Sequence, residues 1–264
     1  MAMRVALVLF LCAPVLAAQG GSTRPAIGSG LAPTGTLRAV FLATNPVQGR
    51  VDPQSGATSG PAPDLVRELA RRLGVPHAIT PMPDAAAVID SVKRGTADIG
   101  FLAYEAARAA QVEFSTPYSL MASAYAVRAD SAIRTTADVD RPGVKIGAVK
   151  GQSQEIFVSA NVKNARVDVR PVVPPNDALA AMLISGEIDA FAANRGRMED
   201  LARTSPRVRV LPDNFLVVGQ AIVVNKGEGA RLEELNRFLA EVRASGFVRS
   251  SIASAGVAGV EAAP

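Results

Sequence analysis

Short apolar runs alternate with amphipathic segments along the first part of the chain. Strands are predicted at Leu37–Ala43, Ala78–Thr80 and Ala97–Ala103, where apolar residues follow one another between turn residues. Between these strands, the apolar residues from Asp64 to Leu73 share one helical face, and a second helix is expected over Ala85–Arg94. Strands that alternate with helices in this way predict a parallel sheet with helices on its faces.

A second unit of the same kind is predicted between residues 144 and 211. Its expected strands and helices are Val144–Val149, a helix from Gln154, Val167–Val173, Asp177–Ser185, Ile188–Ala193, a helix near Met198, and Val208–Leu211. Both units contain a joint of helix, glycine and strand in which Asp follows Gly by three residues, at Gly95–Asp98 and Gly186–Asp189. This echo is weak alone, but together with the matching order of elements it supports two similar lobes.

Two segments are expected to connect the units. A strand over Leu120–Arg128 leads into the second unit, and Gln220–Asn225 leads back before a helix over Arg231–Ala244. We therefore predict an α/β fold of two lobes, each a mostly parallel sheet flanked by helices, arranged as a clamshell with two hinge crossings near Ala126 and Gly219. The predicted division is lobe 1 at 36–126 and 220–255, lobe 2 at 127–219, and a tail at 256–264 that is expected to fray.

The N-terminus has the pattern of an export signal. Arg4 precedes an apolar run that ends in small residues, so residues 1–18 are predicted to be a secretory signal peptide cleaved near Ala17 or Ala18. Residues 19–35 are rich in Gly, Ser and Pro and are expected to form a flexible leader. Cys12 lacks the small preceding residue of a lipoprotein site, so we expect a soluble periplasmic protein, with a lipid anchor as the less favoured alternative.

Composition excludes several kinds of site. Hydrophobic residues make up 48% and charged residues 20% of the chain, which is typical of a globular protein. The net charge of +4 is scattered, so nucleic acid is not indicated as a partner. Once the signal peptide is removed no cysteine remains, and His77 is the only histidine, so disulfides and cysteine-based metal sites are excluded. We expect neither a metal nor a cofactor.

The stretch from Ser91 to Tyr118 carries a long motif. It reads S-V-K-R-G-T-A-D-I-G-F-L-A-Y-E-A-A-R-A-A-Q-V-E-F-S-T-P-Y. It closely resembles the signature of solute-binding protein family 3, the periplasmic amino-acid-binding proteins of ABC importers. The matching residues are Gly95, Asp98, Arg108, Phe114, Ser115, Pro117 and Tyr118, while Glu113 stands for the usual Asp and Glu105 for the usual Thr. The resemblance runs from about Thr36 to Ala255 and implies the periplasmic-binding-protein-like clamshell.

Arg108 is the strongest candidate for ligand binding. It is predicted just past the carboxyl end of a buried strand, where open α/β sheets bind ligands. A guanidinium binds a carboxylate through two parallel hydrogen bonds, and in the resembling family the arginine at this position holds the ligand's α-carboxylate. The alternative, a solvated surface arginine, is less favoured by the surrounding motif. Phe101 and Ala103, on the strand before Arg108, are also candidate ligand-binding residues, and Ala103 stands where the family has Thr.

A second candidate segment follows the strand Val144–Val149. Gly151 and Ser153 match a G-T-T motif of the family, whose second Thr helps to hold the same carboxylate. Backbone N–H groups at a helix start attract anions, and Ser153 either donates its hydroxyl to the ligand, caps the helix, or does both. Gln152 and Gln154, which flank Ser153, are included as candidates.

Departures from the family pattern change the expected ligand. Asn194 stands where members that bind amino acids usually have the Asp that holds the ligand's ammonium, and Leu42 and Asn45 stand near the usual Asp and aromatic residue of the first strand. The pair that binds carboxylate is thus retained, while the acids that bind ammonium are missing. We expect an anion whose α-ammonium is absent or weakly recognised, unless Glu105 or another acid takes over.

These residues favour a protein that binds a small carboxylate-bearing solute, either amino-acid-like or an organic acid, and delivers it to an ABC transporter permease. We expect it to be a monomer. The first alternative is a periplasmic dehydratase resembling the cyclohexadienyl dehydratases, with Glu105 or Glu155 as the acid. The second is the sensor module of a signalling protein, which normally has a transmembrane continuation, and none follows Pro264.

Overall fold

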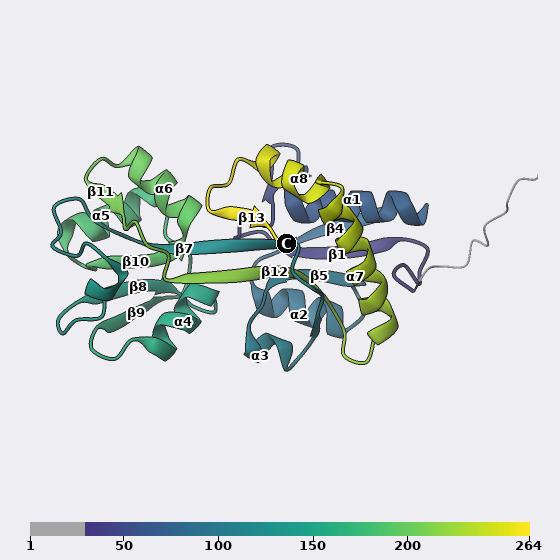
Figure 1. Cartoon of the computed structure of the whole chain (residues 1–264), viewed down its shortest axis with the longest axis horizontal. Helices are drawn as coiled ribbons and strands as arrows, with labels where there is room; N and C mark the ends of the chain where they lie inside the picture. The colour runs from purple at the N-terminus through teal and green to yellow at the C-terminus, as the bar shows by residue number, and fades with distance from the viewer. Residues whose placement is uncertain (1–29) are drawn as a thin grey trace, which may run out of the picture.

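The computed structural model describes residues 30–264 as two lobes joined by two long strands (Figure 1). The expected signal peptide and residues 19–29 of the expected leader lie outside the described residues. The leader prediction is wrong for Leu31 and Ala32, which are fully buried against the core that includes Leu37 and Leu65. Burial of these two apolar side chains means that the fold begins before Thr36.

Lobe 1 contains three parallel strands in the order β4, β1, β5. Helices cover both faces of this sheet (Figure 1). The main elements of lobe 1 are β1 (Leu37–Leu42), α1 (Pro61–Leu73), β4 (His77–Met82), α2 (Ala85–Lys93), β5 (Ile99–Ala103), α3 (Ala106–Ala109), α7 (Gly229–Ala244) and α8 (Phe247–Ala255). Its smaller elements are β2 (Arg50–Val51) and β3 (Thr58–Ser59), which form a hairpin, and β6 (Glu113–Phe114).

Lobe 2 repeats this arrangement with three parallel strands in the order β9, β8, β10. Its elements are the short 3-10 helix Thr136–Asp138, β8 (Lys145–Val149), α4 (Ser153–Asn161), β9 (Arg166–Arg170), α5 (Asn176–Ser185), β10 (Ala190–Asn194), α6 (Arg195–Thr204) and β11 (Val208–Val210). In both lobes, therefore, the first strand lies between the second and the third.

Two long antiparallel strands, β7 (Ser119–Arg128) and β12 (Leu216–Val224), run between the lobes (Figure 1). β12 pairs with β5 of lobe 1, and β7 pairs with β10 of lobe 2 from Ser123 onward. The two crossings of the chain thus join the parallel strands of both lobes into one curled mixed sheet. This architecture confirms the predicted two-lobed α/β fold, whereas the division at residues 126 and 219 stays a prediction.

The two Gly-to-Asp joints have the same structural role in both lobes. In lobe 1 the Asp98 carboxylate accepts the backbone N–H of Arg38 at 2.8 Å, and the N–H of Asp98 donates to the Arg38 carbonyl at 2.8 Å. In lobe 2 Asp189 makes the same two bonds with Lys145, both at 2.8 Å. Each Asp therefore joins the start of a third strand to the start of a first strand, so the sequence echo corresponds to a structural repeat.

The first helix begins earlier than predicted. Its N-cap is Gly60, with a φ of 108° that favours glycine, and Pro61 occupies the first helical position. Asp64 lies in the first turn and does not cap the helix; its carboxylate accepts hydrogen bonds from Arg67 and Ser251. The prolines before Asp64 thus lie inside the first turn of the helix.

The tail is ordered and contacts both lobes, so the expectation of a frayed end is wrong. β13 (Val260–Ala262) pairs antiparallel with β7 at Ser119–Met121. On the lobe 2 side, the Ala258 carbonyl approaches α6 so closely that a Cβ atom on Gly196 would lie 2.5 Å from its oxygen. We call residues 256–264 the strap, because they bridge the crossing strand β7 and α6.

Candidate functional site

The candidate site is a small cavity between the lobes. Lobe 1 contributes the end of β1 and the following loop, the end of β5, and Arg108 on α3, while lobe 2 contributes the start of α4 and the end of β10. The lining residues are Leu42, Thr44, Asn45, Ala103, Arg108, Met121, Gln152, Ser153, Gln154 and Asn194. Seven of the eight candidate residues from the sequence, all except Phe101, therefore line one cavity.

Arg108 bridges the lobes. The one-turn helix α3 directs its side chain inward, and the residue is only 7% exposed. Nη1 donates to the Ala103 carbonyl of lobe 1 at 2.9 Å, and Nη2 donates to the Gly151 carbonyl of lobe 2 at 2.8 Å. Burial lowers the pKa of Arg108, and the nearby Glu105 opposes this shift. Arg108 therefore places a guanidinium cation inside the cavity.

The start of α4 supplies the lobe 2 side of the cavity. Gly151 has a φ of 73°, which permits the tight turn after β8, and the N-cap of α4 is Gln152, without a side-chain cap. Ser153 is therefore the first helical residue, and its proposed role as a cap is wrong. The first-turn N–H groups at Ser153 and Gln154 have no intrahelical partner. Together with the buried Ser153 hydroxyl, these N–H groups form a set of donors suited to an anion.

Uncharged side chains link the two lobes behind Arg108. Nε2 of Gln154 donates to Oδ1 of Asn194 at 2.7 Å and to Oγ of Ser123 at 2.9 Å, and Nδ2 of Asn194 donates to Oδ1 of Asn45 at 3.1 Å. The chain of amides continues into lobe 1, where Nδ2 of Asn45 lies 3.5 Å from Oε1 of Gln220. This network crosses the cavity without a charged group.

No acid lines the cavity within the described part of the chain. The carboxylate of Glu155 accepts a hydrogen bond from the N–H of Gly151 at 3.0 Å, and Glu105 occupies the N-cap position of α3. Neither residue is part of the cavity lining. The charge of Arg108 is thus the only formal charge among the lining residues. This cavity favours an anion electrostatically, and its amides offer both donors and acceptors for neutral polar groups.

Phe101 is not part of the cavity, so its assignment to the site is wrong. It is fully buried in the core of lobe 1, where its ring meets Tyr118 edge to face with centroids 5.8 Å apart. The sequence pattern did not identify three polar residues behind the site: Gln220, which lies next to Asn45, Gln48, whose Nε2 donates to Oε1 of Gln220 at 3.1 Å, and Ser123, which accepts from Gln154. Gln220 and Ser123 lie within the long strands that cross between the lobes, and a buried polar residue inside an apolar strand is the signal that identifies them.

The lobes are closed around the site. The cavity has a volume of about 30 Å³, which is room for roughly one or two water molecules. A molecule the size of an amino acid fits between these residues only when the lobes are further apart. Between residues 30 and 264, no three His, Cys, Asp or Glu side chains lie together as a metal site would require. Over the same range, no helix has both the length and the apolar character needed to cross a membrane.

Comparison with known proteins identifies bacterial solute-binding proteins as the relatives of this chain. Residues 37–250 match the family described as bacterial extracellular solute-binding proteins, family 3. The L-cystine-binding protein TcyJ of Escherichia coli K12 is 27% identical over 199 residues, which cover 74% of this chain and 73% of the relative.

Two solved structures share the fold. A protein from Wolinella succinogenes, solved in complex with lysine, aligns with a TM-score of 0.71 at 20% identity, over 82% of this chain and 94% of that one. The ancestral amino acid-binding protein AncCDT-1, a precursor of cyclohexadienyl dehydratase, aligns with a TM-score of 0.69 at 23% identity, over 83% of this chain and 95% of that one.

Proposed function

The chain belongs to the bacterial extracellular solute-binding proteins of family 3, and from this premise we propose that it captures a small carboxylate-bearing solute between its lobes. We propose further that it delivers this solute to an ABC transporter permease, working as a monomer in the periplasm after loss of a signal peptide. The cystine-binding relative and the lysine-bound neighbour support a small, amino-acid-like solute.

One observation carries the proposal: within residues 30–264, Arg108 is the only charged residue that lines the interlobe cavity. Its guanidinium now donates to two backbone carbonyls, and a carboxylate is a stronger acceptor for the same two donors. The first-turn N–H groups of α4 and the Ser153 hydroxyl lie on the opposite wall. We propose that Arg108 and the start of α4 hold the solute's carboxylate from both sides.

We propose that the preferred solute has no α-ammonium, or one that is weakly recognised. A buried ammonium without an acidic partner carries a large desolvation cost. Asn194 bonds to Gln154 and Asn45, so an amide occupies the position at which an acid would neutralise that charge. A keto or hydroxy acid avoids the cost, because its hydroxyl or carbonyl is satisfied by these amides.

Calorimetric titration of matched pairs tests this proposal. Each α-amino acid in a screening set is compared with its α-keto and α-hydroxy counterparts, with a thermal-shift screen used to select the pairs, since a ligand of the folded state raises the melting temperature. We expect the keto or hydroxy acid of the best pair to bind more tightly. Sub-micromolar binding of an ordinary amino acid, without binding of its keto acid, would show that our interpretation of Asn194 is wrong.

A dehydratase remains the second candidate, because AncCDT-1 is a precursor of such an enzyme. The two acids considered for that chemistry, Glu105 and Glu155, do not line the cavity, which favours the binding role. A turnover assay with prephenate and arogenate distinguishes the two functions. Product formation that Glu105→Gln or Glu155→Gln abolishes would favour the enzyme.

A further inference from the structure

A second hollow lies between the lobes beside the strap. Its volume is about 280 Å³, several times that of the cavity at Arg108. Arg50 of the β2–β3 hairpin lines it from lobe 1, Arg197 and Arg203 of α6 line it from lobe 2, and the strap contributes residues 256–258. It contains none of the residues that line the Arg108 cavity.

The arginines of this hollow are not all neutralised. Two acids, Glu199 and Asp200, also line it, but Asp200 pairs with Arg203 at 3.0 Å and Glu199 with Arg195 at 3.4 Å. Within residues 30–264, neither Arg50 nor Arg197 has a carboxylate within 4.0 Å. Two arginines, one from each lobe, therefore line the hollow without a carboxylate partner.

Arg197 is held in place without being neutralised. Its Nη2 donates to the Pro174 carbonyl at 2.7 Å, and its guanidinium carbon lies 5.7 Å from the centroid of the Phe191 ring. Burial lowers the pKa of Arg197, which indicates that its charge is partly removed from water without a counter-ion. Such a cation gains most from an anion brought next to it.

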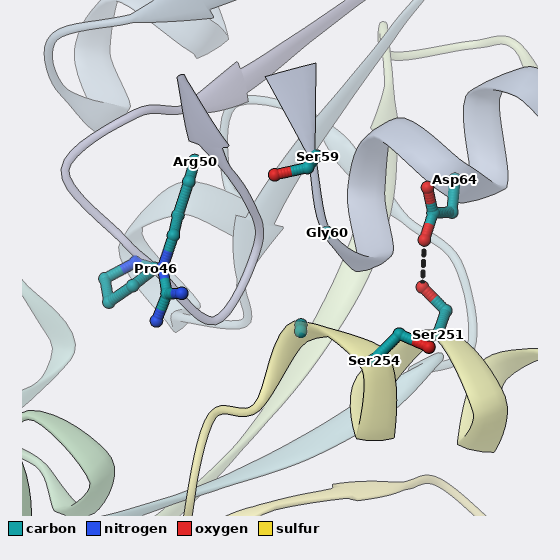
Figure 2. Close-up of a pocket in the computed structure, with 8 residues that line it drawn as sticks. Pro46, Arg50, Ser59, Gly60, Asp64, Ser251 and Ser254 are labelled. Atoms are coloured by element: carbon teal, nitrogen blue, oxygen red, sulfur yellow. Dashed lines mark hydrogen bonds between the residues drawn. The ribbon is translucent and has the colours of Figure 1, made fainter. Parts of the chain in front are cut away.

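Arg50 also borders an adjoining hollow of about 190 Å³ (Figure 2). There the hydroxyls of Ser59, Ser251 and Ser254 line the wall, and the one acid, Asp64, is engaged by Ser251 Oγ at 2.5 Å. Arg50 thus borders both hollows, and the adjoining one also contains the hydroxyls of Ser59 and Ser254.

We propose that Arg50 and Arg197 form a second binding site, for a small tetrahedral oxyanion of the phosphate class. Guanidinium forks match the oxygens of phosphate with two parallel hydrogen bonds each, so one phosphate can accept from both arginines. Because one arginine belongs to each lobe, a bound oxyanion holds the lobes together. The site therefore favours the closed arrangement independently of the solute at Arg108.

Calorimetry with inorganic phosphate tests the site, at pH 7.5 and constant ionic strength set with chloride. We expect one phosphate per wild-type chain, binding at least tenfold weaker in Arg50→Ala, which changes an exposed hairpin residue, and in Arg197→Gln, which keeps a donor for Pro174. Arg207→Ala, which removes an exposed arginine of lobe 2 elsewhere, is the matched control and should bind as the wild type does.

Arg108→Ala should still bind one phosphate, at an affinity lowered only because loss of the bridge to Gly151 makes closure of the lobes less favourable, and this separates the two sites. Absence of phosphate binding to the wild type, or unchanged affinity in Arg50→Ala, would overturn the proposal. Loss of phosphate binding in Arg108→Ala but not in Arg50→Ala would overturn it as well, since phosphate would then be a ligand of the first cavity. If circular dichroism shows that Arg197→Gln is unfolded, the result for Arg50→Ala decides alone.

Discussion

The guanidinium of Arg108 donates to one carbonyl from each lobe, so a single side chain combines two tasks. It stabilises the closed arrangement, and among the described residues it presents the only formal charge in the cavity lining. In the function that we propose, a ligand carboxylate competes with the two carbonyls for the same N–H groups. On that proposal, the affinity for the ligand depends on the planar fork of this residue more than on its charge alone.

Replacement of Arg108 is expected to remove carboxylate binding. Arg108→Ala should weaken the binding of the solute selected by the screen by about 2–5 kcal/mol, because a buried charge-assisted pair is lost. Arg108→Lys should also bind poorly, since an ammonium cannot reproduce two parallel bonds. Calorimetry measures both, with Arg94→Ala, an exposed arginine of the same lobe, as the control. Wild-type affinity in Arg108→Ala would exclude this site.

The other residues of the Ser91–Tyr118 motif support lobe 1. Asp98 forms an ion pair with Arg38 at 2.6 Å, and Ser115 Oγ accepts the N–H of Ile222 at 2.9 Å. Tyr118 is fully buried, its hydroxyl has no partner within the described structure, and burial raises its pKa. A long motif thus identified the fold and one ligand-binding candidate, because only Arg108 of its matching residues reaches the cavity.

Phe101 shows why spacing alone cannot place every residue of a site. All five residues of β5 are buried, so no alternation of apolar and polar positions distinguishes the side chains that face the core from those that face the cavity. Ala103 lines the cavity and Phe101 lies in the core of lobe 1, although both are on the same strand. Only the tertiary packing determines this difference.

At the scale of elements, the sequence predicts those with strong local patterns and misses those fixed by distant contacts. The apolar stripe of α7 and the three parallel strands of each lobe appear where the pattern places them. The strap has small residues and no periodicity, and its strand β13 exists because β7 offers a partner far away in the sequence. Long-range pairing of this kind leaves no local signal.

Helix α1 contains an acid whose ionisation should stabilise the fold. Glu68 accepts hydrogen bonds from Arg71 at 2.8 Å and from Arg72 at 2.7 Å, and Arg72 also pairs with Glu241 of α7 at 2.6 Å. The hydrogen bond from Arg71, followed by Arg72, lowers the pKa of Glu68 from 4.5 to about 2, against the opposing effect of burial.

Glu68→Gln should therefore cost stability only where Glu68 is ionised. A folded-state pKa below the unfolded value means that the contribution is complete above about pH 4.5 and is lost as pH falls toward 2. Because Arg71 is largely exposed and screened by water, we expect only about 0.5–1 kcal/mol at pH 7. Urea unfolding at several pH values measures it, with Glu233→Gln, an exposed acid of α7, as the control. A difference that grows on acidification would contradict this assignment.

At the scale of the whole molecule, the close packing of the strap against α6 depends on one glycine, Gly196. Gly196→Ala places a Cβ atom 2.5 Å from the Ala258 carbonyl oxygen, so α6 or the strap must move. We expect a loss of about 1–3 kcal/mol of unfolding free energy from this overpacking. Alanine is otherwise the better helix former, so propensity alone predicts the opposite sign.

Gly229→Ala is the matched control for this change. Gly229 is also a helical glycine, its φ is not positive, and a Cβ there would meet no atom within 4 Å. The control should gain about 0.4–1 kcal/mol, because alanine restricts the unfolded chain. Urea unfolding of both variants compares the signs of their changes in unfolding free energy. Stabilisation by both substitutions would show that the strap moves at no cost to accommodate a Cβ atom on residue 196.

The bridge from Arg108 to Gly151 also has a kinetic consequence. In the function that we propose, a cavity of about 30 Å³ cannot admit the solute, so binding requires this bridge to break and the lobes to separate. The observed association rate should therefore rise with solute concentration only up to a plateau, and that plateau equals the rate at which the lobes open. Molecules in the closed arrangement also weaken the measured affinity, because the apparent dissociation constant equals the intrinsic one divided by the fraction of molecules that are open. A change that weakens the bridge but leaves the N–H donors of Arg108 intact would therefore raise the association rate and lower the apparent dissociation constant at the same time.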